Sequence, residues 1–252
     1  MDGENKVAVV TGGGSGIGRA AAIALAKDGF ALVLGGRRMA PLESVASEIA
    51  SVGGDAWPIA CDVGQEADVR RLFAAARQHF GRVDFLFNNA GISPPRHSIS
   101  DVPLEEWNAA VAVNLTGVFL CTREAFAAMR DQRPCGGRIV NNGSISAHVP
   151  RPGSLAYTAT KHAVTGITRA TALEGRPYQI ACGQIDIGNA ATALTADLSS
   201  GREQADGEWR SEATMDVDQA GRAVAYMASL PLDANVLFMT IMATAMPYVG
   251  RG

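Results

Sequence analysis

The chain has 252 residues, of which 47% are hydrophobic and 19% are charged. This composition is that of an ordinary globular protein and excludes long disorder or a collagen-like repeat. The net charge is −3, and because no basic run occurs that would neutralise a row of phosphates, we expect no nucleic-acid partner.

The four cysteines lie far apart in the sequence, without clustered histidines. This spacing predicts neither a metal site nor a disulfide framework and suits a cytoplasmic protein. The first residues lack the basic and apolar regions of a signal peptide. The longest uncharged stretch, 234–250, is shorter than the roughly 20 apolar residues that span a bilayer, so we expect no membrane association and interpret it as a buried tail.

Short apolar runs alternate along the chain with longer segments typical of helices. The runs are mostly apolar throughout, as in parallel strands that are covered on both faces. The alternation predicts an α/β fold, a Rossmann-type doubly wound parallel sheet with helices on both faces. Because no repeat or linker divides the chain, we expect a single domain over 1–252. Strands are predicted at 7–10, 31–34, 57–60, 85–87, 138–141 and 180–185, and helices at 17–29, 41–51, 65–80, 104–130 and 154–174.

A glycine-rich segment, TGGGSGIG at 11–18, lies between the first predicted strand and the first predicted helix. Residues without side chains let backbone N–H groups and the positive helix N-terminus approach a pyrophosphate. A nucleotide-hydrolysing P-loop fits poorly, because Arg19 and Ala20 stand where lysine and serine or threonine are needed. A glycine-rich turn without a ligand is the alternative. The residues predicted to contact a dinucleotide here are Gly12, Gly14, Ser15, Gly16, Ile17 and Gly18.

The second predicted strand leads into Gly35, Gly36, Arg37 and Arg38. A dinucleotide fold that prefers NAD offers a carboxylate to the ribose 2′-hydroxyl at this place, and none is present. Two guanidinium groups suit a 2′-phosphate instead, because their planar forks bind phosphate oxygens in pairs. We therefore expect NADP(H) to be favoured over NAD(H). The alternative is that both arginines face solvent at a helix N-terminus.

Tyr157 and Lys161 lie four positions apart in a predicted helix, so both point from one face. At about 4 Å and an effective dielectric of about 20, an ammonium ion stabilises a phenolate by roughly 4 kcal/mol. The pair therefore favours general acid–base catalysis by the phenol near neutral pH. Many helices carry such a pair on their surface, so its significance depends on the neighbouring motifs.

Taken in chain order, the motifs resemble the short-chain dehydrogenase/reductase family. They are TGGGSGIG at 11–18, DV at 62–63, NNAG at 88–91, Asn114, Ser144 and YTATK at 157–161. The resemblance implies that Ser144 hydrogen-bonds the substrate oxygen, Tyr157 transfers the proton, Lys161 holds the nicotinamide ribose, and Asn114 continues a proton relay. It further implies cofactor contacts by Asp62, Val63, Asn89, Ala90, Gly91, Gly188 and Thr192.

Two departures from the family pattern limit what the resemblance implies. The family has Pro-Gly before a cofactor-contacting threonine, whereas Ile187 precedes Gly188 here, which weakens the placement of a nicotinamide. The end of the chain lacks the family's terminal Gly-Gly and is rich in methionine, a residue more typical of core packing than of recognition.

The sequence thus predicts an oxidoreductase that interconverts an alcohol and a carbonyl on a small organic substrate. We expect the loops at 92–101, 145–154 and 190–214 to shape its pocket, the last as a lid. The helices at 104–130 and 154–174 resemble those through which family members form dimers or tetramers. Two alternatives are a cofactor-binding regulator without turnover and a serine hydrolase using Ser144 with His148 or His162, although NGSIS at 142–146 is not a GxSxG elbow.

Overall fold

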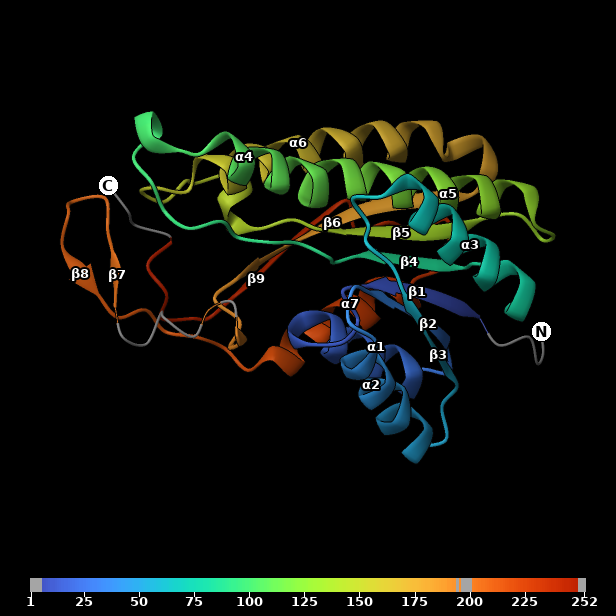
Figure 1. Ribbon diagram of the computed structural model, residues 1–252. Helices are drawn as coiled ribbons and strands as arrows, with labels where there is room; N and C mark the ends of the chain where they lie inside the picture. The colour runs from blue at the N-terminus through green and yellow to red at the C-terminus, as the bar shows by residue number, and fades with distance from the viewer. Residues whose placement is uncertain (1–5, 194, 196–200, 249–252) are drawn as a thin grey trace.

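The computed structural model describes residues 6–193, 195 and 201–248. Within them, seven strands form one parallel sheet in the order β3-β2-β1-β4-β5-β6-β9 (Figure 1). This is the doubly wound Rossmann-like α/β fold that the sequence predicts. The strands are β1 (Val7–Thr11), β2 (Ala31–Gly36), β3 (Ala56–Ala60), β4 (Phe85–Asn88), β5 (Gly137–Asn142), β6 (Ile180–Gly188) and β9 (Phe238–Met242).

Helices cover both faces of this sheet (Figure 1). One layer contains α1 (Gly16–Lys27), α2 (Met39–Ser51) and α7 (Val217–Ser229). The other contains α3 (Glu66–Phe80), α4 (Leu104–Val111), α5 (Gly117–Asp131) and α6 (Leu155–Glu174). Because successive strand residues point to opposite faces, Ala8 and Val10 pack into the first layer while Val7 and Val9 pack into the second. Burial on both sides explains why the strands are apolar throughout.

The C-terminal quarter of the chain contains a helix and a strand of the main sheet layer that the sequence analysis missed, besides the short pair β7 and β8. We interpreted 234–250 as a buried tail, but it supplies β9, which pairs in parallel with β6. Its side chains at the sheet edge are only partly covered, and Thr240 interrupts the apolar run, so it lacks the pattern of the central strands. Helix α7 packs so closely on α1 that a Cβ on Gly221 would lie 2.6 Å from the Ala20 carbonyl oxygen.

A buried arginine joins this C-terminal part to the centre of the sheet. Arg138 on β5 is only 2% exposed. Its guanidinium donates to the Asn235 side-chain oxygen at 2.9 Å and to the carbonyl oxygens of Pro231 at 2.9 Å and Ala234 at 2.8 Å. These contacts fix the turn between α7 and β9 although the residues lie more than ninety positions apart along the chain.

The predicted helix at 104–130 is one helical run with an irregular turn inside it. A π-helical turn, Ala112–Thr116, lies between α4 and α5. The whole run, Leu104–Asp131, has 28 residues and a mean hydropathy of 1.2 in its most apolar window, and 44% of that window is buried in the fold. Leu120, Ala125 and Met129 pack into the core beneath the sheet, so the run is a core helix of this domain.

The loops that follow the strands meet at the carboxyl edge of the sheet. β1 and β4 are neighbours there, although β1 is followed by β2 in sequence, and such a reversal of strand order is where α/β sheets bind ligands. The segment predicted as a lid, 190–214, also lies at this edge. It includes an antiparallel pair, β7 (Arg202–Glu203) and β8 (Trp209–Arg210), while its residues 194 and 196–200 lie outside the described part.

Candidate active site

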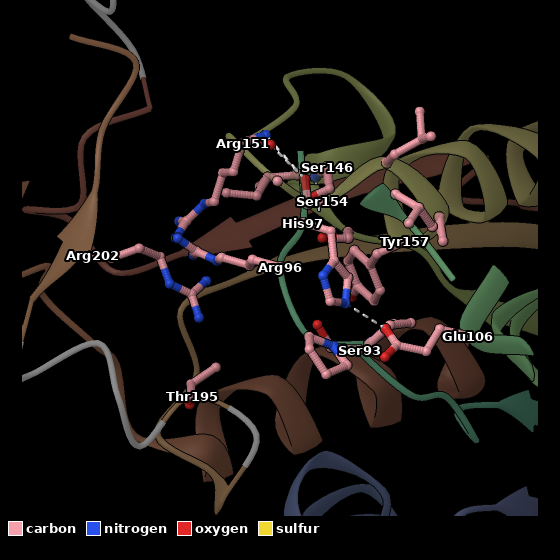
Figure 2. Close-up of a pocket in the computed structure, with 18 of the residues that line it drawn as sticks. Ser93, Arg96, His97, Glu106, Ser146, Arg151, Ser154, Tyr157, Thr195 and Arg202 are labelled. Atoms are coloured by element: carbon pink, nitrogen blue, oxygen red, sulfur yellow. Dashed lines mark hydrogen bonds and ion pairs between the residues drawn. The ribbon is translucent and has the colours of Figure 1, made fainter. Parts of the chain in front are cut away.

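Two cavities adjoin each other at the carboxyl edge of the sheet. The smaller, of about 400 Å³, lies over the glycine-rich loop and the ends of β2, β4 and β5. The larger, of about 650 Å³, lies among the loops that follow β4, β5 and β6 (Figure 2). Tyr157 lines both cavities, with Ser144 on the side of the larger and Lys161 on the side of the smaller. A group bound in one cavity can therefore react with a group bound in the other beside a single phenol.

The glycine-rich loop is shaped by close backbone packing. Gly12 and Gly16 have φ angles of 65° and 51°, in the left-handed region where glycine is least strained. A Cβ on Gly18 would lie 2.2 Å from the Gly12 carbonyl oxygen. The Asn89 amide group donates to the carbonyl oxygens of Thr11 at 3.0 Å and Gly12 at 3.3 Å, which ties the loop to the end of β4.

The N-terminus of α1 opens onto the smaller cavity. Within the described residues, the Ser15 side chain makes no capping hydrogen bond with the first turn of α1, and Ser15, Gly16 and Ile17 line the cavity. Arg19 donates two hydrogen bonds to Glu48 on α2 rather than reaching the loop. This arrangement fits an anion at the helix N-terminus and differs from that of a P-loop lysine.

Arg37 and Arg38 lie at the rim of the smaller cavity, immediately after β2. Both are exposed, and Arg38 is the residue that precedes the first turn of α2. Gly36 ends β2, and a Cβ there would lie 3.3 Å from a methyl group of Leu42. Across the cavity, Asp62 accepts a hydrogen bond from the Gly64 N–H at 3.0 Å. The rim therefore combines two guanidinium groups with one carboxylate.

Helix α6 places Tyr157 and Lys161 one turn apart, as their spacing predicts. Lys161 is 5% exposed, and its ammonium group donates to the Asn142 carbonyl oxygen at 2.7 Å. The same ammonium nitrogen lies 5.5 Å from the centre of the Tyr157 ring. The ammonium group of Lys161 and the ring of Tyr157 therefore lie together at the smaller cavity.

Ser144 and Asn114 complete the predicted catalytic set but lie in different places. Ser144 is buried in the loop after β5 and its hydroxyl oxygen accepts the Ser146 N–H at 3.1 Å. Asn114 is fully buried in the π-helical turn, where its amide group exchanges two hydrogen bonds of 2.8 Å with the Ile92 backbone. It also donates to Thr160 at 3.4 Å, next to Lys161. Ser144, Tyr157 and Lys161 are thus together at the cavities, with Asn114 behind them.

Most of the residues predicted to contact the cofactor line the smaller cavity. Gly18 instead packs inside the loop, and Gly188 packs against Met246 and Met242, since a Cβ there would lie 2.8 Å from the Met246 sulfur. The lining includes Gly12, Gly14, Ser15, Gly16, Ile17, Arg37, Arg38, Asp62, Val63, Asn89, Ala90, Gly91, Tyr157, Lys161 and Thr192.

The sequence analysis did not single out a buried ion pair beside the larger cavity, of which Arg151 lines the cavity and Glu212 lies behind it. Arg151 donates to Glu212 at 2.7 Å and to the Asn189 side-chain oxygen at 3.0 Å. Burial opposes ionisation of Glu212, but hydrogen bonds from Asn189 and Gln204 and the charge of Arg151 hold its pKa below the ordinary value. Asn189 follows Gly188 with a φ of 42°. This network fixes the loop after β6, where the family's proline is replaced by Ile187.

A second missed group is Asp186, a carboxylate on the buried strand β6. It is 1% exposed, accepts the Ser144 N–H at 2.9 Å and pairs with the His148 ring at 2.9 Å. A single acidic residue inside the apolar run at 180–188 was the available signal. His148 and His162 bond to Asp186 and to the Thr158 carbonyl oxygen, respectively. These contacts do not form the serine–histidine relay of a hydrolase.

Comparison with known proteins agrees with this geometry. A family model described as short chain dehydrogenase matches residues 6–203. A 3beta-hydroxysteroid dehydrogenase of Mediterraneibacter gnavus is 35% identical over 197 residues, which cover 78% of this chain and 70% of that protein.

Two solved structures share the fold over nearly the whole chain. A 3-ketoacyl-(acyl-carrier-protein) reductase of Brucella melitensis, complexed with NADH, is 31% identical with a TM-score of 0.84, covering 96% of this chain and 98% of that one. An alcohol dehydrogenase of the archaeon Thermococcus sibiricus, complexed with 5-hydroxy-NADP, is 26% identical with a TM-score of 0.84 and the same coverage, 96% and 98%. The chain therefore belongs to the short-chain dehydrogenase/reductase family and is a nicotinamide-dependent oxidoreductase of alcohol or carbonyl substrates.

Proposed function

We propose that the protein is an NADP(H)-preferring enzyme that interconverts an alcohol and a carbonyl on a small organic substrate. The observation that carries this proposal is the position of Tyr157, which lines both the cavity suited to a dinucleotide and the cavity suited to a substrate. Both cavities have the size of small-molecule sites, which run from about 300 to 1,000 Å³. A regulator that only senses the cofactor would not need a buried ammonium group beside this phenol.

The smaller cavity fits a nicotinamide dinucleotide, which supplies or accepts the hydride when bound. Its pyrophosphate suits the loop of Gly12 and Gly16 at the N-terminus of α1. Arg37 and Arg38 stand at the rim, where they would attract a 2′-phosphate. NADP(H) is therefore the favoured cofactor and NAD(H) the alternative.

The catalytic roles follow from the positions of four side chains. Tyr157 transfers the proton to or from the substrate oxygen, and Ser144 donates a hydrogen bond to that oxygen from the larger cavity. Lys161 would hold the nicotinamide ribose and, with its ammonium nitrogen 5.5 Å from the centre of the Tyr157 ring, would stabilise a phenolate. Asn114 holds the Ile92 carbonyl group behind the site and continues a proton relay toward solvent through water.

The segment 190–214 serves as a lid in this proposal. Its residues Ala193, Thr195 and Arg202 line the larger cavity, so movement of the segment would change access to the substrate. A substrate-dependent change in proteolytic cleavage of this segment would test the role.

We further propose a dimer or tetramer located in the cytoplasm. The neighbouring helices α4, α5 and α6 expose Leu104, Phe119 and Leu173 at 67%, 49% and 59%, which a second copy would cover. All four cysteines are free, as in a reducing compartment. Burial raises the pKa of the Cys61 and Cys182 thiols to about 12, so these two do not react as thiolates. Sedimentation showing only monomer at micromolar concentration would contradict the assembly.

The test of the function is a turnover panel of ketones, aldehydes, sugars and hydroxy acids, assayed with both cofactors and in both directions. We expect turnover of at least one class, with NADP(H) more efficient than NAD(H). Cofactor binding is measured separately by fluorescence of the reduced nicotinamide. Tight binding without turnover of any class would favour the regulatory alternative.

A further inference from the structure

We propose that the larger cavity binds the anionic end of the substrate, a carboxylate or a phosphate ester, on three arginines that come from separate loops. Arg96 follows β4, Arg151 follows β5 and Arg202 lies on β7, and all three line this cavity. In Figure 2 their side chains point toward one another, and Tyr157 lies on the opposite side of the drawn residues. The inference rests on the proposed function, because it identifies the chemical group at one end of the substrate while the reacting oxygen at the other end meets Tyr157.

The charge of the lining favours an anion. Among the described residues that line the cavity, three arginines accompany one carboxylate, Glu106, which is hydrogen-bonded to His97 at 2.9 Å. Arg151 is also paired with Glu212, which lies behind the lining. Each of the three arginines also has interactions within the chain, so a bound anion would join a cluster that is already held in place. Guanidinium groups from three loops that face one partly enclosed space favour an anion between them, with Arg96 and Arg202 adding positive charge beside the Arg151–Glu212 pair.

Arg151 is the fixed member of the cluster. Its side chain is 8% exposed and that of its partner Glu212 is 1% exposed, so the guanidinium cannot swing into solvent. Asn189 bonds to both of these residues and holds them at the end of β6. A preorganised donor loses little conformational freedom when it binds, which favours recognition of one end of a small molecule.

The experiment measures binding rather than turnover. Protein saturated with NADP+, or with NAD+ if only that cofactor binds, is titrated calorimetrically with benzoate, phenyl phosphate and benzamide. We expect at least one of the two anions to bind ten-fold or more tightly than neutral benzamide. The anion that binds more tightly identifies the end group as carboxylate or phosphate. Equal affinity for all three ligands would overturn the proposal.

A double variant identifies the groups responsible. Arg96→Gln with Arg202→Gln should remove the preference for anions and leave benzamide binding unchanged. Arg210→Gln is the matched control, because Arg210 lies opposite Arg202 in the β7–β8 pair and its exposed side chain bonds to Glu208. Unchanged anion binding by the double variant would contradict the site. Anion binding without turnover in the substrate panel would instead uphold the site and refute the proposed function.

A different observation carries a second inference: we propose that Asp186 and His148 form a positioning pair for Ser144. One oxygen of the buried Asp186 carboxylate accepts the Ser144 N–H at 2.9 Å and the Gln184 amide at 2.8 Å. The other accepts from His148 at 2.9 Å. A Cβ on Gly143 would lie 2.0 Å from this carboxylate, so the backbone before Ser144 packs directly on it.

The backbone of residues 142–144 is held from two sides, by the Asp186–His148 pair and by Lys161. Lys161 donates to the carbonyl oxygen of Asn142, two residues before Ser144. The segment 142–144 is thus fixed between the Lys161 ammonium group and the Asp186 carboxylate. His148 is 44% exposed at its side chain and keeps the second carboxylate oxygen occupied, which fixes the rotation of Asp186. The hydroxyl direction of Ser144 therefore depends on a histidine that does not contact the substrate.

A double-mutant cycle tests this role, which rests on the proposed function of Ser144. We expect His148→Ala to lower kcat about ten-fold without changing the KM of the cofactor, and His148→Gln, which still donates to Asp186, to restore most of it. In a Ser144→Ala background, His148→Ala should cause no further loss. His162→Ala, on the exposed side of α6, is the control and should retain full activity.

The outcomes distinguish a failure of the Asp186–His148 positioning pair from a failure of the catalytic role proposed for Ser144. Equal losses from His148→Ala in the presence and absence of the Ser144 hydroxyl would show that His148 does not act through Ser144 and would overturn the pair. The same holds if His148→Ala changes thermal stability but leaves kcat unaltered. Full activity of Ser144→Ala itself would instead refute the catalytic role proposed for Ser144.

Discussion

The two cavities meet at Tyr157 but are built in different ways. The smaller uses backbone: a glycine-rich loop, a helix N-terminus and the ends of neighbouring strands. The larger uses side chains, with three arginines and a histidine from loops far apart in sequence. Backbone recognition suits a ligand whose phosphates are the same in every member of the family. Side-chain recognition on loops can vary without disturbing the sheet, which is why we propose that the larger cavity selects the substrate.

The largest expected effect lies at the junction of the two cavities. Tyr157→Phe removes the transferable proton and keeps the ring that lines both spaces. We expect turnover to fall by about 10² to 10⁴-fold while the affinity for the cofactor changes little. Steady-state kinetics and fluorescence titration of the reduced cofactor measure the two effects. Substantial residual turnover in a well-folded variant would show that another group moves the proton.

The next effect concerns the side-chain network of the larger cavity. Glu212→Gln leaves the buried Arg151 charge without its ion-pair partner, and breaking such a pair costs about 3 to 5 kcal/mol of stability. Denaturant unfolding at pH 7 measures this loss. Gln204→Ala, which removes only one of the hydrogen bonds to Glu212, should cost less. A loss below about 1 kcal/mol for Glu212→Gln would place the pair among weak surface contacts.

Glu212 should also make the stability of the protein depend on pH. Because the pKa of Glu212 in the folded protein lies below its ordinary value of 4.5, its carboxylate stabilises the fold at pH values above the ordinary pKa. That contribution is lost as the pH falls through the lowered folded pKa. The stability difference between the wild type and Glu212→Gln should therefore be constant near neutral pH and shrink in acid. A difference that grows in acid would reverse the sign of the linkage.

Two glycine-to-alanine substitutions test whether cofactor binding depends on the backbone of the smaller cavity. A Cβ on Gly18 would lie 2.2 Å from the Gly12 carbonyl oxygen, so Gly18→Ala must displace the loop. We expect about 1 to 3 kcal/mol of destabilisation and a clear loss of cofactor affinity. Gly166 on α6 is the control, because a Cβ there meets no heavy atom within 4 Å among the described residues. Gly166→Ala should be neutral or slightly stabilising.

The contrast between the cavities also explains how far the sequence could be interpreted. The strands from β1 to β6 and the glycine-rich loop follow from local patterns, because buried parallel strands are apolar throughout and a tight strand–loop–helix turn requires glycine. Arg151 and Glu212 are 61 positions apart, and no local pattern links them. Strand β9 was missed because Thr240 interrupts its apolar run and it lies in a stretch that we interpreted as a tail, whereas the equally exposed edge strand β3 was predicted. The side-chain network of the larger cavity could therefore not be predicted, because it depends on contacts between segments that are distant in the sequence.

The smallest expected effect is the cofactor preference, which depends on exposed groups. Arg37 and Arg38 lie at the rim of the smaller cavity, and Gly36 occupies the place where a carboxylate would bind the ribose 2′-hydroxyl. A charge-assisted contact with a phosphate contributes about 1.5 to 3 kcal/mol, and solvent exposure points to the lower end, about ten-fold in favour of NADP(H).

Replacing Gly36 by Asp together with Arg37 by Leu should reverse the ratio of kcat/KM values for the two cofactors, because a carboxylate repels the 2′-phosphate that a guanidinium attracts. The new Cβ would lie 3.3 Å from the flexible end of Leu42, so the fold can accommodate it. Arg19→Leu is a control for loss of positive charge near α1, since Arg19 is bonded to Glu48 and should leave the ratio unchanged. A wild-type enzyme that already works better with NAD(H) would show that both arginines face water, and the cofactor cavity would then owe its specificity to the backbone alone.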